Sequence, residues 1–67
     1  MKQPTPADVK SARIAAGLTQ TRAAAVIHKK LLAWQRYESG NRKMDAAYYE
    51  LFLIKTGQLE IDQSHRT

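Results

Sequence analysis

The chain has no cysteine, which excludes disulfide bonds and thiolate metal sites. Its two histidines, His28 and His65, lie far apart and fit no ligand pattern, so we expect neither a metal nor a cofactor. No apolar run approaches the length of a membrane span, and residues 1–4 lack the apolar stretch of a signal peptide. We therefore expect a cytoplasmic protein that makes no membrane contact.

Groups for catalysis are missing as well. The sequence offers no serine–histidine–acid set and no paired carboxylates at helical spacing, so we expect no enzyme activity. With 67 residues the chain makes one domain, residues 1–67, with little room for a cleft or a small-molecule effector. A core this small is marginally stable, which makes support from a partner chain plausible.

Acidic residues are nearly absent from the middle of the chain. Residues 10–43 hold eight basic side chains and one acid, Glu38, whereas the rest of the chain is slightly negative. In a chain of net charge +5, this distribution attracts a polyanion such as a nucleic acid. Solubility alone is the other explanation of the charge.

The first half of the chain contains signals for two helices. Thr5 is placed as a cap, with Pro6 at the first helical position, and Gly17 suits a left-handed end. Thr19 caps a second helix that runs to about residue 27, and its alanines allow another helix to approach closely. The polar residues 28–30 follow, and we interpret them as a turn.

A third helix is predicted over residues 31–38, before the turn formers around Gly40. Leu31, Trp34 and Tyr37 recur every three residues, which indicates one buried face. Trp34 on such a face favours a core position over stacking on single-stranded nucleic acid.

A fourth helix begins after the cap Asp45 and runs to about residue 56. It is apolar nearly all round, which favours cover on more than one side. Residues 59–62 alternate like a short strand that has no partner within one chain. We expect an ordered core over about residues 5–57, and a tail, residues 58–67, that can contact a second copy. The predicted dimer contacts are Tyr49, Leu53, Ile54, Leu59 and Ile61.

Two short helices joined by a tight turn inside a basic segment form a helix-turn-helix, which reads double-stranded DNA through the major groove. Arg and Gln side chains can bond guanine and adenine edges, and apolar side chains can touch thymine methyl groups. The predicted base-reading residues face away from the core: Lys30, Leu32, Ala33, Gln35 and Arg36. Predicted phosphate contacts lie at the start of the second helix and in the basic segments: Thr19, Gln20, Lys29, Arg42 and Lys43. Arg22 either joins them or pairs locally.

The segment resembles the Xre-type regulators, the family of phage Cro and repressor proteins. The resemblance covers about residues 7–56. The residues that carry it are Gly17-Leu18-Thr19-Gln20, Ala24, Trp34 to Gly40, and Arg42-Lys43. It implies an all-α, repressor-like bundle of four to five helices with a short C-terminal tail. Residues 24–38 and residues 50–57 also resemble short phage or mobile-element regulators, some of them anti-CRISPR-associated autorepressors.

The resemblance implies roles for particular residues. Ser39 and Asn41 belong to the loop that grips phosphate in this family, together with the basic pair after them. Arg13 and Glu38 match a structural pair that ties the first helix to the end of the third. The chain departs from the family at His28, where glycine is usual, and at Lys30, where a capping serine or threonine is usual and lysine has no acceptor.

The leading functional hypothesis is a sequence-specific transcriptional regulator, a homodimeric repressor that binds an inverted repeat. The alternative is an antitoxin or adaptor whose apolar fourth helix and tail bind a different protein.

Overall fold

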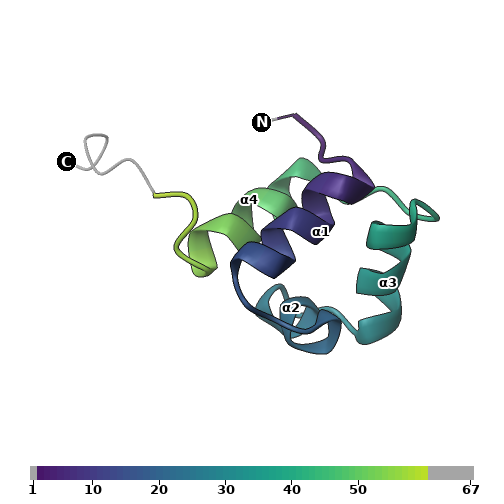
Figure 1. The fold of residues 1–67 in the computed structure, drawn as a ribbon. Helices are drawn as coiled ribbons and strands as arrows, with labels where there is room; N and C mark the ends of the chain where they lie inside the picture. Colours follow the sequence, from purple (N-terminus) through teal and green to yellow (C-terminus); the bar gives the residue numbers. More distant parts are fainter. Residues whose placement is uncertain (1, 61–67) are drawn as a thin grey trace.

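The computed structural model describes residues 2–60, which form four α-helices and no strand (Figure 1). The helices are α1 (Pro6–Ala15), α2 (Gln20–Val26), α3 (Leu31–Ser39) and α4 (Ala46–Lys55). This confirms the predicted all-α bundle. None of these helices is long and apolar enough to cross a membrane.

The start of α1 is fixed by a reciprocal pair of hydrogen bonds. The backbone N–H of Asp8 donates to the Thr5 hydroxyl at 3.1 Å, and the backbone N–H of Thr5 donates to the Asp8 carboxylate at 3.0 Å. Pro6 occupies the first helical position, where its missing N–H has no intrahelical partner to lose. The expected cap is therefore present in full.

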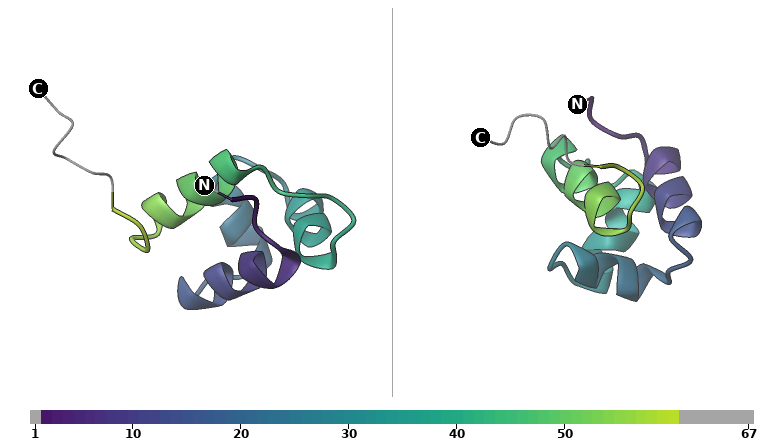
Figure 2. Two further views of the ribbon diagram at one scale, coloured as in Figure 1. Left: turned by 90° about the horizontal axis from the view of Figure 1, so that it is seen from above. Right: turned by 90° about the vertical axis from the view of Figure 1, so that its left-hand side faces the viewer.

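The core is built around two aromatic rings from α3 and α4. The rings of Trp34 and Phe52 lie 4.9 Å apart between centroids, and both side chains are almost completely buried. Ala23 and Ala24 are fully buried on α2, and their small size allows α2 to pack closely against α3. Figures 1 and 2 show α3 at one edge of the bundle, far from the C-terminal end of α4.

All four helices end at a residue in the left-handed conformation. Three of these residues are the glycines of the chain, Gly17, Gly40 and Gly57, and the fourth is His28 with φ of 59°. After α2 the backbone N–H of Lys29 bonds the carbonyl of Ala24 at 2.8 Å, which closes the last turn as a glycine would. The turn that lacks glycine thus adopts the geometry typical of glycine.

Contacts from α4 hold this turn in place. The Lys55 ammonium donates to the carbonyl of Val26 at 3.1 Å, which satisfies a free acceptor at the end of α2, and it lies 3.4 Å from Nε2 of His28. The Lys29 ammonium lies 4.5 Å from the ring centroid of Tyr48, in cation–π geometry.

Leu31 is not on the buried face of α3, contrary to our expectation. Its side chain is 39% exposed, whereas Trp34 and Tyr37 are buried. A spacing of three falls short of the helical repeat of about 3.6 residues, so each step drifts by about 60° around the axis. Ala33, on the other flank of the Trp34–Tyr37 face, packs partly against the core.

Two expectations about α4 and its ends were also wrong. Asp45 stands at the N-cap position, but its side chain makes no capping hydrogen bond. Leu59 does not begin a strand. Its backbone N–H instead bonds the carbonyl of Leu53 and helps to close the end of α4. Glu60 belongs to no strand either, and residues 61–62 of the predicted strand, with the predicted dimer contact Ile61, lie outside the described residues.

The chain itself covers α4 more fully than its composition suggested. Phe52 is buried, and the side chains that pack partly against the core are Tyr48, Tyr49, Leu51 and Leu53. The side chain amide of Gln58 donates to the carbonyl of Ala12 at 3.0 Å and ties the end of α4 to α1.

The left-handed turn predicts a particular pattern of stability at position 28. His28→Asn should be nearly neutral, because asparagine tolerates positive φ. His28→Val should lower the free energy of unfolding by about 1–2 kcal/mol, since a β-branched side chain is strained in this region. Urea unfolding of both variants checks this, and equal stability of the two would contradict the left-handed turn.

Candidate nucleic-acid interface

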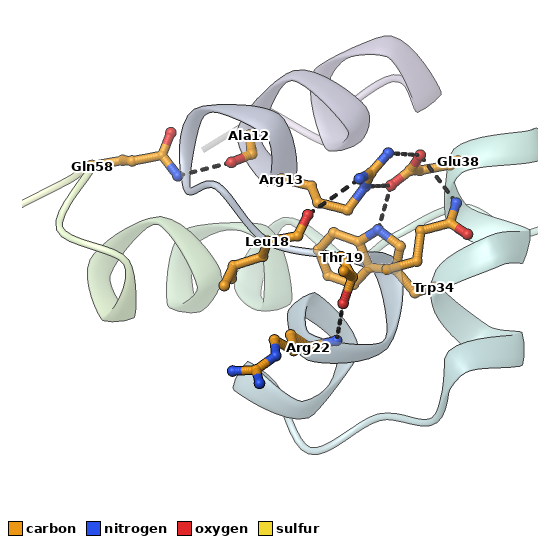
Figure 3. Close-up of polar contacts among 9 residues, drawn as sticks. Ala12, Arg13, Leu18, Thr19, Arg22, Trp34, Glu38 and Gln58 are labelled. Atoms are coloured by element: carbon orange, nitrogen blue, oxygen red, sulfur yellow. Dashed lines mark hydrogen bonds and ion pairs between the residues drawn. The ribbon is translucent and has the colours of Figure 1, made fainter.

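The carboxylate of Glu38 is the meeting point of three helices (Figure 3). It accepts bonds from Arg13 of α1 at 2.6 Å (Nε to Oε2) and 3.2 Å (Nη2 to Oε1). It also accepts from the amide of Gln20 of α2 at 3.3 Å, and from the indole N–H of Trp34, one turn earlier on α3, at 2.5 Å. The Glu38 side chain is only 8% exposed, so these donors replace the water it has lost.

This arrangement sets the charge state of the pair. Desolvation alone would raise the pKa of Glu38, but the hydrogen bonds from Arg13, Trp34 and Gln20 outweigh it and lower the pKa below its ordinary value. The bond to Glu38 correspondingly raises the pKa of Arg13, against desolvation. Glu38 is therefore an anion in the folded chain.

The same guanidinium also positions the start of the helix-turn-helix. Nη1 of Arg13 donates to the carbonyl of Leu18 at 3.2 Å, immediately before the Thr19 cap. The Thr19 hydroxyl in turn accepts the backbone N–H of Arg22 at 3.2 Å. One arginine thus links α1, the entry to α2 and the end of α3.

The outward face of α3 follows from the buried one. Trp34 and Tyr37 point into the core, and each residue advances by about 100° around the helix. Leu32 therefore lies opposite the core, and Gln35 and Arg36 flank it; all three are exposed. Ala33, which we expected on this face, packs against the core instead.

The loop after α3 bends back onto the helix. The Ser39 hydroxyl donates to the carbonyl of Arg36 at 3.1 Å, and the backbone N–H of Arg42 bonds the same carbonyl at 3.2 Å. The backbone N–H of Asn41 bonds the Ser39 oxygen at 3.4 Å. Arg42 and Lys43 are thereby held beside the end of α3 with exposed side chains.

The other predicted phosphate contacts fall into two groups. Arg22 and Lys30 are exposed, and Figure 3 shows the Arg22 side chain directed away from Glu38. Thr19, Gln20 and Lys29 already have partners within the chain: a backbone N–H, Glu38 and the Tyr48 ring. Their side chains serve the scaffold in this structure.

The predicted dimer contacts are less exposed than the sequence suggested. Tyr49 and Leu53 pack partly against the core, whereas Ile54 and Leu59 are half-buried outside that cluster. Burial and the nearby charge of Asp8 raise the pKa of Tyr49.

A pocket of about 290 Å³ opens between the N-terminal segment and the loop after α3. Its lining includes Pro4, Tyr37, Met44, Arg42 and Lys43. Its volume lies at the lower limit of small-molecule sites, which begin at about 300 Å³. Among the described residues no cluster of histidine and acidic side chains could hold a metal ion.

Sequence reasoning missed the part that Trp34 and Gln20 play in holding Glu38. Trp34 lies four residues before Glu38, a spacing that places both on one helical face, so this bond could have been inferred from the sequence. The bond from Gln20 joins two helices and has no local signal. No protein-family model matches this chain, and no curated protein matches it either.

Removing one partner of the central ion pair should be costly. Arg13→Ala leaves a nearly buried carboxylate short of two hydrogen bonds, and we expect a loss of about 2–3 kcal/mol in the free energy of unfolding. Arg22→Ala, an exposed matched control, should change it by less than about 0.5 kcal/mol. Chemical denaturation of both variants measures the difference, and equal effects would refute a structural role for the pair.

The lowered pKa of Glu38 predicts loss of stability in acid. The contribution of this carboxylate is fully present above its ordinary pKa of 4.5 and is lost as the pH falls through the lower pKa of the folded chain. Glu38→Gln should be less stable at pH 7 and should lack this component. Unfolding curves between pH 7 and acid conditions test it, and parallel pH profiles for both proteins would contradict the assignment.

Proposed function

We propose that this protein is a sequence-specific regulator of transcription that binds double-stranded DNA in the cytoplasm, with α3 as the helix that enters the major groove. The observation that carries the proposal is the outward face of α3, where Gln35 and Arg36 are exposed beside a basic loop. Glutamine and arginine side chains make bidentate hydrogen bonds to the edges of adenine and guanine, respectively.

The charge around this face supports the same function. No acid occurs between Asp8 and Glu38 in the sequence, and Glu38 is almost buried and paired with Arg13. The exposed bases Lys30, Arg36, Arg42 and Lys43 consequently face no exposed carboxylate from this stretch. Such a surface attracts the phosphate backbone and favours contacts on both sides of an inserted helix.

The resemblance to the Xre-type regulators supports a simple mode of action. A small chain of this kind binds as a homodimer to an inverted repeat and represses by covering a promoter, with half-sites about 34 Å apart. Within the described residues, Ile54 and Leu59 are the predicted contacts that lie outside the core cluster. A second copy that packs on them is part of the proposal.

A mobility shift on the DNA upstream of the protein's own gene, at two salt concentrations, tests this function. A specific complex should survive added salt better than the complex with random DNA. Light scattering of the free protein should give the mass of a dimer. A stable complex with a different protein and no specific DNA complex would favour the antitoxin or adaptor alternative.

Arg36→Ala should weaken binding to the selected site by about 1–3 kcal/mol and relax the choice of base at one position. Lys10→Ala, which removes an exposed basic side chain on α1, is the control and should leave base choice unchanged. Titration of both variants on specific and random duplexes separates these effects. Unchanged specificity in the Arg36 variant would exclude α3 as the reading helix.

A further inference from the structure

Exposed apolar side chains are concentrated at the start of α3. Among residues 2–60 three large apolar side chains are exposed: Ile14 (59%), Leu31 (39%) and Leu32 (57%). Two of them are neighbours on the helix that carries Gln35 and Arg36. Moving a leucine side chain out of water lowers the free energy, so this pair favours an apolar partner on the outward face of α3.

Leu32 has the more favourable position of the two. It precedes Trp34 by two residues, so it lies on the opposite side of the helix from the core. It precedes Arg36 by four residues, which places both side chains on one face about 6 Å apart along the axis. Any base edge that Arg36 contacts therefore has a neighbouring edge within reach of Leu32.

The major groove offers few apolar groups to such a side chain. Base edges there present hydrogen-bond donors and acceptors, and the apolar exception is the methyl group on C5 of thymine. A cytosine methylated at C5 carries the same group at the same place. The positive surface around Leu32, with Lys30 before it and Arg36 after it, fits DNA better than it fits an apolar protein groove.

We propose that Leu32 is a specificity-determining residue that contacts the C5 methyl group of a pyrimidine in the major groove. The inference rests on the proposed function and adds a definite chemical requirement to it. A base-pair step is about 3.4 Å, so the methylated pyrimidine lies within about two base pairs of the base contacted by Arg36.

The test begins with selection of duplexes by the wild-type protein from a random library. Thymines of the selected site are then replaced one at a time by deoxyuridine, which removes the methyl group and retains the base pair. One replacement should weaken binding about fourfold, the value expected for the burial of one methyl group. That position should lie within about two base pairs of the one at which Arg36→Ala relaxes specificity.

Two variants show whether Leu32 makes the contact. Leu32→Ala should bind the thymine and deoxyuridine duplexes equally, because the side chain that meets the methyl group is gone. Ile14→Ala, a matched truncation of an exposed apolar side chain on α1, should retain the fourfold difference. Leu32 is largely exposed, so Leu32→Ala should fold, and circular dichroism checks this. The deoxyuridine replacements tested with the wild-type protein do not depend on this variant.

A second selection, from a library that contains 5-methylcytosine in place of cytosine, separates the two sources of the methyl group. Thymine is the source if both libraries yield thymine at the sensitive position, and 5-methylcytosine is the source if the second yields it there. Either result supports the proposal. Specific binding that no deoxyuridine or unmethylated cytosine weakens would overturn it and leave the proposed function intact, whereas failure to select any site would overturn both.

Discussion

The hydrogen-bonded carboxylate of Glu38 is the interaction on which the rest of the structure depends. A charge that is only 8% exposed is costly unless donors replace the lost water. Arg13, Gln20 and Trp34 supply those donors from α1, α2 and α3, so the carboxylate is satisfied only when all three helices hold their native places. One side chain therefore joins α1, α2 and α3, in addition to the packing of their buried residues.

This use of Glu38 also shapes the outer surface. The chain has no other acid between Asp8 and Asp45, and this one is turned inward and neutralised by Arg13. The guanidinium of Arg13 is occupied by this ion pair. On the outward side Arg36, Arg42 and Lys43 remain exposed, and Glu38 does not weaken their positive potential.

Local signals explain what the sequence could predict. Caps and left-handed stops, such as Thr5 and Gly17, act within one helical turn, so the bounds of the helices were accessible. The pairing of Arg13 with Glu38 came from the family resemblance. The packing of Ala33 against the core and the exposure of Leu31 depend on how α3 is oriented in the bundle. The partner of the Lys29 ammonium, the Tyr48 ring, comes from α4. No local sequence signal indicates these contacts, and the sequence analysis missed them.

The turn between α2 and α3 shows why those non-local contacts matter. A histidine in the left-handed conformation is less favourable than a glycine, and Lys30 cannot cap α3 with its side chain. The turn is instead held from outside: Lys55 bonds the end of α2, and Lys29 lies against Tyr48. With Glu38 at the other end of α3, the helix is fixed at both ends before any ligand arrives. The proposed binding through its outward face would then require little ordering of the backbone, so that contacts made there contribute to affinity with a small entropic loss.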